Sequence, residues 1–397
     1  MSASLIVGDV HLGGGLNIGK PGIGSNLNSR IIDQLQTLDW ILDTSVNKYI
    51  DNIFLTGDIF EDPKPHPALI SLFLDWLKKC SIHDINVHII SGNHDVLRSG
   101  QYYISALDVI VSAEIPNIYV YKNISTVHTD GASFTLMPFR DRRSFNTDSN
   151  LEAIQKLSDK LDFQVPEIPL ENLKIIVGHL AIEKSIPIGD EFDDMSNELF
   201  CPLSMFSKYD YVWMGHVHKP QVLSEKPYIS HIGSMDFATF YEASHTKKIV
   251  LINPKTQHHF EYIDVPNRPL YHININIPQD VEDVNEFILS ELSKNKNLKK
   301  SIVRLNIILE NPEIKSIDRH LIEKFLTDSG VFYVNRISEE RKISPIKKKQ
   351  NVDIDNTINP LTALKMYADL NVDNSIKNDF IKYSLEIIEE FNNSKDN

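Results

Sequence analysis

The sequence predicts an α/β fold, because strand-like and helix-like segments alternate along the first part of the chain. Apolar runs at 5–7, 53–55 and 87–90 each stop at glycine and polar residues, as buried strands do. Between them, 30–48 repeats apolar residues at helical spacing, and 68–80 is the next predicted helix. We therefore expect a sheet with helices packed on its faces.

The chain is long enough for a large domain followed by a smaller one. Further strands are expected at 134–139, 174–177 and 211–214, and a strand, turn and strand over 228–254 complete the first domain. A small α/β domain follows, then a polar linker, then two short amphipathic helices that should bury their apolar faces against a partner. The expected limits are 1–266 for the first domain, 267–335 for the second, 336–358 for the linker and 359–397 for the helical segment.

Composition and charge exclude several classes of protein. The net charge of −14 argues against a basic surface that wraps nucleic acid, although metal ions and a local basic lip can supply positive charge at a site. Cys80 and Cys201 are far apart, so neither a disulfide framework nor a thiolate zinc site is expected. The first residues lack the basic start of a signal peptide, and no apolar stretch is long enough to cross a bilayer. We therefore expect a cytoplasmic protein that does not enter a membrane.

Polar side chains that can bind metal or move a proton follow five of the predicted strands. Ligand sites in open α/β sheets lie beyond the carboxyl ends of the strands, so these groups are expected to meet. Each group alone is weak evidence, because a Gly-Asp pair is usually a turn and a single histidine is usually structural. Five groups in one chain favour a functional site. They are Asp9 with His11, Asp58, Asn93 with His94 and Asp95, His179, and His216 with His218.

The donor atoms of these residues predict a centre for two metal ions. Imidazole nitrogens and hard oxygens without sulfur suit Mn²⁺, Fe or Zn²⁺ with five or six ligands. A carboxylate among them can bridge two ions about 3.5–4 Å apart, an arrangement that serves the cleavage of phosphate esters.

Five motifs, in this order, resemble the signature of the calcineurin-like metallophosphoesterases: Asp9-x-His11, Gly57-Asp58, Gly92-Asn93-His94-Asp95, Gly178-His179 and Gly215-His216-x-His218. The resemblance implies a β-sandwich flanked by helices and two divalent metal ions, with Mn²⁺ as the expected metal. It implies that the first ion is held by Asp9, His11, Asp58 and His218. The second would be held by Asp58, which bridges the two ions, and by Asn93, His179 and His216.

Within this superfamily the sequence is more similar to the DNA-repair nucleases of the Mre11 and SbcD type. The likeness rests on Gly57-Asp58-Ile59-Phe60, on His231-Ile232-Gly233-Ser234-Met235-Asp236 ahead of Phe240-Tyr241-Glu242, and on the strand 248–251. Beyond about residue 265 it is a likeness of architecture. It implies a DNA exonuclease or endonuclease that forms a homodimer through its first domain. Residues 359–397 would dock on the coiled-coil base of a Rad50- or SbcC-type ATPase.

Other residues near the expected metal centre are candidates for catalysis or DNA contact. His94 is outside the ligand set and would donate a proton to the leaving group. Asp95 would orient the His94 ring or cap the next helix. Glu61 stands where many cellular members of the family have histidine, so DNA is expected to be positioned differently there. Three arginines would form either a lip that grips DNA phosphates or a solvated loop: Arg140, Arg142 and Arg143.

Two other functions stay open from the sequence. The same metal centre would serve a phosphodiesterase or phosphatase that acts on small molecules or phosphoproteins, but such an enzyme has no need of the second domain, the linker and the helices. A non-catalytic scaffold with this fold would lack a ligand or the proton donor, whereas this chain has all of them.

Overall fold

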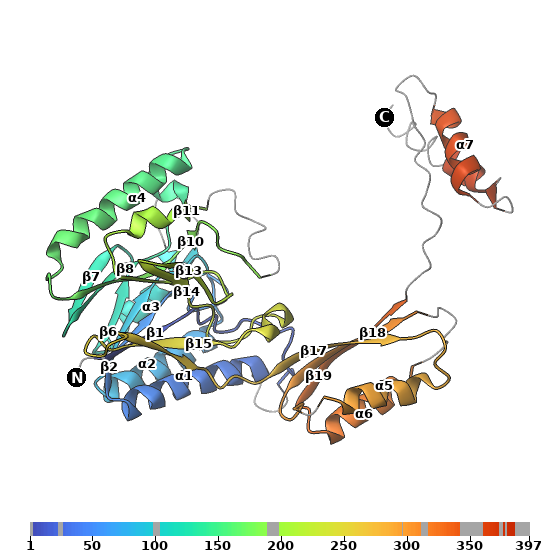
Figure 1. Ribbon diagram of the computed structural model, residues 1–397, viewed down its shortest axis with the longest axis horizontal. Helices are drawn as coiled ribbons and strands as arrows, with labels where there is room; N and C mark the ends of the chain where they lie inside the picture. The colour runs from blue at the N-terminus through green and yellow to red at the C-terminus, as the bar shows by residue number, and fades with distance from the viewer. Residues whose placement is uncertain are drawn as a thin grey trace. The chain divides into compact units, whose positions relative to one another are not determined.

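The computed structural model divides the chain into two compact units. One unit contains Met1–Ile275, Asn285–Asn306 and Ile317–Ser338, and the other contains Asn276–Val284, Ile307–Ser316 and Glu339–Asn397. The structure describes residues 3–22, 27–97, 104–188, 198–295, 297–310, 317–341, 360–372, 376–377 and 379–385 (Figure 1). The domain limits expected from the sequence, after residues 266, 335 and 358, remain predictions.

The first of two six-stranded sheets has helices packed on one face (Figure 1). Its elements are β1 (Ala3–Val7), α1 (Ser29–Asn47), β2 (Ile50–Leu55), α2 (Pro67–Ile82), β3 (Asn86–Ile90), β6 (Ile118–Tyr121), β15 (Lys248–Ile252) and β16 (Phe260–Asp264). The strand order is β16-β15-β1-β2-β3-β6, and β1, β2, β3 and β6 are parallel. Leu38, Ile41 and Phe73 of the helices share an apolar core with Leu5 and Ile53 of the strands. The predicted helices and strands of this region are thus confirmed.

The second six-stranded sheet packs against the other face of the first. Its elements are β7 (Ser125–Thr129), β8 (Ala132–Met137), α4 (Asn150–Gln164), β9 (Leu173–His179), β12 (Tyr211–Gly215), β13 (Gln221–Glu225) and β14 (Tyr228–His231). The strand order is β13-β14-β12-β9-β8-β7. One apolar cluster with Phe54, Phe134 and Trp213 joins the two sheets, and another joins α4 to the second sheet through Leu157 and Met214. The fold is therefore the expected β-sandwich flanked by helices.

The sequence patterns do not reveal every element of the sandwich. Helix α4 was not predicted, because only the narrow stripe of Ala153, Leu157 and Leu161 is buried and its other faces are largely polar. The edge strands β7 and β13 are only partly buried and were not predicted either. The shorter elements are β4 (Val96–Leu97), β5 (Ile104–Ser105), α3 (Leu107–Ser112), β10 (Ala181–Ile182), β11 (Phe200–Cys201) and the 3₁₀ turns η1 (Arg142–Phe145), η2 (Val165–Glu167), η3 (Leu203–Phe206) and η4 (Phe240–Ser244).

A separate three-stranded sheet follows the sandwich in the chain. Its order is β17-β18-β19, and the elements are β17 (Leu270–Ile277), α5 (Val284–Ser293), β18 (Ile302–Leu309), α6 (Arg319–Asp328) and β19 (Tyr333–Arg341). Residues 336–341, which were expected to begin the linker, belong to β19. These residues lie on an edge strand that has no fully buried position, so they do not show the apolar alternation of a buried strand.

The end of the chain contains the predicted helix that opens at Pro360, α7 (Pro360–Asn371). Residues 379–385 are also helical, within the second predicted helix. The rest of the expected linker, 342–358, and the last residues, 386–397, lie outside the described residues. Among the described helices, none combines the length and apolar character needed to cross a membrane.

Candidate metal centre

The carboxyl ends of five strands from the two sheets meet at one edge of the sandwich. Asp9 follows β1, Asp58 follows β2 and Asn93 follows β3, whereas His179 ends β9 and His216 follows β12. The backbone N–H of His216 donates to Asp9 Oδ2 at 2.7 Å, and His179 Nε2 lies 2.8 Å from Asn93 Oδ1. Residues far apart in the sequence are therefore in direct contact, as the strand-end motifs predict.

The glycines of these motifs allow neighbouring strand ends to approach closely. A Cβ atom on Gly92 would lie 2.0 Å from Asp58 Oδ1, and one on Gly215 would lie 2.1 Å from Asp9 Oδ1. Any larger residue would push these carboxylates out of the site. The Gly that precedes a polar group is therefore required by packing between loops.

Several of the polar residues have a backbone conformation that non-glycine residues rarely adopt. The φ angles are 46° at His11, 46° at Asp58 and 78° at His216. Each such residue costs on the order of 1–3 kcal/mol and persists only where its surroundings hold it. Here the Asp58 carboxylate accepts a hydrogen bond of 2.8 Å from the backbone N–H of His94, while the Asp58 carbonyl accepts one from the N–H of His11. The strain is thus maintained by contacts within the site.

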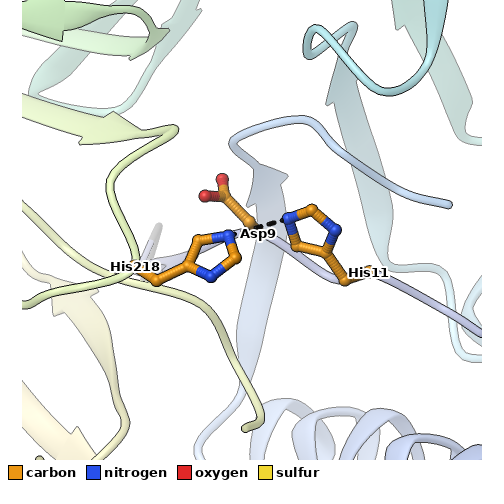
Figure 2. A group of neighbouring side chains, drawn as sticks. All are labelled: Asp9, His11 and His218. Carbon is orange, nitrogen blue, oxygen red and sulfur yellow. Dashed lines mark hydrogen bonds between the residues drawn. The ribbon is translucent and has the colours of Figure 1, made fainter. Parts of the chain in front are cut away.

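The first group of ligand atoms comes from Asp9, His11 and His218 (Figure 2). The Nε2 atoms of His11 and His218 face each other at 3.0 Å. On the far side of its ring, His11 Nδ1 lies 2.8 Å from Glu61 Oε2 and donates to it. In the neutral ring the lone pair is then on His11 Nε2, and it points into the site. This Nε2 atom lies 3.5 Å from Asp58 Oδ2.

The second group brings His179 and His216 to Asn93 and Asp58. The His179 Nδ1 donates to the backbone carbonyl of Thr56 at 2.8 Å, so in the neutral ring Nε2 is the acceptor atom. That Nε2 lies 3.3 Å from Asp58 Oδ2. His216 Nδ1 lies 2.9 Å from Asn93 Oδ1, the same oxygen that His179 approaches. Lone pairs of imidazoles, amide and carboxylate therefore converge on one place.

This arrangement of acceptor atoms requires positive charge at its centre. Protons on the imidazoles would supply it, and so would divalent cations bound by the same nitrogens and oxygens. Asp9, Asp58 and His179 form a fully buried group whose ligand atoms are close enough to hold one ion. The residues present therefore fit a metal centre with nitrogen and oxygen ligands.

The carboxylates and imidazoles of the site stabilise each other's charged forms. Burial by itself would raise the pKa of the Asp58 carboxyl, but the neighbouring histidines, above all His179, hold this pKa well below its usual value. Burial would lower the pKa of His11, yet the carboxylates of Glu61 and Asp58 raise it to about 9. In the absence of metal the site takes up protons, and these would be released when a metal ion binds.

Two carboxylates that the motifs do not contain orient the imidazoles. Glu61 bonds His11 Nδ1, and Glu198 forms an ion pair with His216 Nε2. The sequence marked Glu61 only as a departure from the family and gave no sign of Glu198, which follows no strand motif. Such partners fix the tautomer of a metal-binding histidine and increase its basicity.

His94 and Asp95 both lie at the site, but each has other hydrogen-bond partners than the expected contact between their side chains. The His94 Nδ1 donates to the backbone carbonyl of Glu61 at 2.7 Å, and this carbonyl orients the ring. The Asp95 carboxylate instead accepts hydrogen bonds from the backbone N–H groups of Ile59, Phe60 and Gly92. Asp95 is followed by β4 and caps no helix there. Burial raises its pKa to about 7.

The three arginines lie just beyond Phe139, which contacts the second group. The Phe139 ring centroid is 6.2 Å from that of His179 and 6.1 Å from that of His216. Arg140 Nη1 donates to the Phe139 carbonyl at 2.7 Å, and Arg142 and Arg143 open η1. A role of these arginines in binding DNA stays a prediction.

Comparison with known proteins assigns the chain to a family. The sequence profile described as Calcineurin-like phosphoesterase matches residues 4–220, which is more than half of the 397 residues. The chain belongs to this family. The five strand-end motifs all lie within the matched residues, and the family consists of metal-dependent phosphoesterases.

This calcineurin-like phosphoesterase is also similar to a nuclease subunit and to DNA double-strand break repair proteins. It is 22% identical over 257 residues to the SbcD subunit of the nuclease SbcCD of Escherichia coli, covering 58% of the chain and 62% of that relative. It is 24% identical over 217 residues to the DNA double-strand break repair protein Mre11 of Methanopyrus kandleri, covering 54% and 44%. For the Mre11 protein of Nanoarchaeum equitans the identity is 24% over 324 residues, covering 76% and 78%. The chain thus spans less than two thirds of the first two relatives.

Proposed function

We propose that this protein is a two-metal DNA phosphodiesterase and the nuclease subunit of an end-processing complex with an ATPase. The family supports a metal-dependent phosphoesterase, and the similarity to SbcD and Mre11 supports DNA as the substrate. Complex membership and a choice of exonuclease or endonuclease activity are part of the proposal.

One observation carries the chemical part of this proposal. Three imidazoles have an acceptor beside their outer nitrogen: hydrogen bonds join two of them to the Glu61 carboxylate and the Thr56 carbonyl, and an ion pair joins the third to the Glu198 carboxylate. Their inner nitrogens, which are acceptors in the neutral rings, face side-chain oxygens that are acceptors as well. The three rings belong to His11, His179 and His216. Rings held in this way are prepared to bind cations through their inner nitrogens.

We assign the ligands according to which atoms converge. Asp9, His11 and His218 would hold the first ion, and Asn93, His179 and His216 would hold the second. Asp58 would bridge them, since its Oδ2 lies 3.5 Å from His11 Nε2 and 3.3 Å from His179 Nε2. The mixture of nitrogen and oxygen donors without sulfur suits Mn²⁺, which we propose as the metal.

The chemistry at this centre is hydrolysis of a phosphodiester. When bound, two divalent cations neutralise the phosphate and lower the pKa of a water molecule that attacks phosphorus. The bond from phosphorus to the leaving oxygen then breaks, and that oxygen needs a proton. The Nδ1 of His94 already donates to the Glu61 carbonyl, so His94 would donate a proton to the leaving oxygen from Nε2. Asp95 positions the loops that carry Asp58 and Asn93.

The partner part of the proposal concerns the C-terminal segment. We propose that 359–397 docks on an SbcC- or Rad50-type ATPase through the apolar faces of its helices, and that the protein dimerises through its first domain. The similarity to SbcD, which by its name is one component of the nuclease SbcCD, supports this assignment. Copurification of the full chain with such an ATPase, before and after removal of 359–397, would test it.

A cleavage assay tests the proposed activity. The purified full chain is incubated with linear duplex and single-stranded DNA in Mn²⁺, Mg²⁺ or EDTA, beside Asp58→Ala. We expect cleavage in Mn²⁺, none in EDTA and none with Asp58→Ala. Hydrolysis of a chromogenic phosphodiester or monoester without any cleavage of DNA would refute the nuclease assignment in favour of a small-molecule phosphodiesterase or phosphatase. Absence of all hydrolysis would point to a scaffold.

A further inference from the structure

Two cavities lie next to each other beside the metal centre. The larger, about 480 Å³, and the smaller, about 320 Å³, share three lining residues, Asn123, Arg140 and Lys160. Both volumes lie in or near the range of natural small-ligand sites, and the larger would hold a nucleotide-sized group. Because they have a common wall, the two cavities form one continuous depression.

The smaller cavity adjoins the motif that supplies Asn93 and His94. It is lined by Ser91 and Val96, the residues that flank this motif. The Ser91 carbonyl also accepts a hydrogen bond of 2.8 Å from the N–H of Phe139. The depression therefore starts beside the metal centre and leads away from it along Arg140.

The larger cavity is apolar and aromatic at its far end. Phe145, only 7% exposed, and Leu157 line it, and Phe163 stands at its rim with 72% of its surface exposed. Phe163 lies on α4, next to Gln164, which also lines the cavity. Its ring face is available for stacking by a flat ligand.

The shared wall carries positive charge in a protein whose net charge is −14. Arg140 is anchored by the Phe139 carbonyl and by Asn123 Oδ1, at 2.7 and 3.2 Å, and Lys160 Nζ lies 5.3 Å from the Phe145 ring centroid. Lys122 lines the smaller cavity but forms an ion pair with Asp108, and Asp159 also lines the larger cavity, so Arg140 and Lys160 are the cations that carry the argument. Cations that lead to an aromatic pocket are the combination that binds single-stranded nucleic acid, through phosphates and stacked bases.

We propose that the larger cavity receives an unpaired nucleobase of the strand that is cut at the metal centre. The phosphates between the cut and this base would follow the wall formed by Arg140 and Lys160, and the base would stack on Phe163. This inference rests on the proposed nuclease function. It adds that the preferred substrate has a single-stranded end, since a paired base cannot enter the cavity.

The test compares Phe163→Ala with Tyr49→Ala in the full chain with Mn²⁺. Both residues are exposed aromatics, and Tyr49, at 83% exposure, lies at the end of α1 and lines neither cavity. For a single-stranded oligonucleotide, Phe163→Ala should raise KM roughly 5- to 150-fold, the range that loss of base stacking gives. Tyr49→Ala should leave KM unchanged, and both variants should hydrolyse bis(p-nitrophenyl) phosphate at the wild-type rate.

Substrates that lack a single base provide the matching control. In a series of oligonucleotides, an abasic residue is placed at each position near the cut in turn. At one position it should raise the KM of wild type by the same factor as Phe163→Ala does, and it should leave the KM of Phe163→Ala unchanged. Blunt duplex DNA should show the same KM with wild type and Phe163→Ala. Equal KM values for both variants on single-stranded DNA would overturn the base pocket while the nuclease function stands. If wild type cleaves bis(p-nitrophenyl) phosphate but no DNA, the nuclease function fails and this inference with it.

Discussion

Replacing Glu61 with alanine should weaken metal binding at the group that contains His11. The Glu61 carboxylate accepts a hydrogen bond of 2.8 Å from His11 Nδ1, and the two residues hold each other charged, which raises the pKa of His11 to about 9. Loss of such a partner typically reduces metal affinity 10- to 100-fold. The Glu61 side chain is 43% exposed, so water screens the pair and we expect the lower end, about tenfold.

The same substitution should leave the proton donor in place. The His94 ring is bonded to the backbone carbonyl of Glu61, which alanine retains. Glu61→Ala should therefore need more Mn²⁺ for activity but reach the wild-type kcat once Mn²⁺ is saturating. Glu61→Gln, which keeps an acceptor and loses the charge, should fall between alanine and wild type.

The assay is a titration of Mn²⁺ by calorimetry, together with kcat for a chromogenic phosphodiester at each Mn²⁺ concentration. Asp62→Ala is the matched control, because Asp62 is the adjacent acid and its carboxylate accepts from the backbone N–H of Lys64. It should change neither quantity. An unaltered Mn²⁺ affinity in Glu61→Ala, or a kcat that stays low in saturating Mn²⁺, would refute the assignment of Glu61 to His11.

Three further predictions concern the proton donor, the second ion and a buried histidine. His94→Ala should bind Mn²⁺ as wild type does while kcat falls about 10²–10⁴-fold, and a variant that loses Mn²⁺ instead would make His94 a ligand. Glu198→Gln should reduce affinity for one of two Mn²⁺ ions about 10- to 100-fold in calorimetry, because His216 loses its anionic partner; unchanged binding would remove Glu198 from the site. Burial lowers the pKa of His88 to about 4, so the unfolded chain binds more protons between about pH 4 and 6.5 and stability falls as pH decreases through this window, by on the order of 3 kcal/mol. Urea unfolding at pH 4.5 and 7 should show a smaller pH effect for His88→Gln than for wild type, and equal effects would contradict the buried neutral ring.

The residues that meet at the candidate site could be predicted from the sequence, because each follows directly from local structure. A glycine followed by Asp, Asn or His directly after an apolar run marks a strand end, and parallel strands bring such ends together. Glu198 could not be found in this way, since it reaches His216 only through the tertiary fold. For the same reason Asp95 was assigned to its neighbour His94, although its hydrogen bonds go to three backbone N–H groups, two of them at Ile59 and Phe60.

The limits of the prediction for the fold have a similar cause. Helix α4 packs on the second sheet with a narrow stripe, so its composition resembles a solvated segment. Strand β19 continues to Arg341 because it pairs in a sheet, and its charged residues alone indicate a linker. In both cases a polar segment is held in place by what it packs or pairs with.

The number of Mn²⁺ ions bound per chain, and its dependence on Asp58, tests the central claim most directly. Asp58 contacts both groups, at 3.5 Å from His11 Nε2 and 3.3 Å from His179 Nε2. Calorimetric titration of the metal-free protein should give two ions for wild type, and Asp58→Asn should weaken the binding of both. A single ion in wild type, or two ions bound with unchanged affinity by Asp58→Asn, would contradict a centre in which Asp58 bridges two metals.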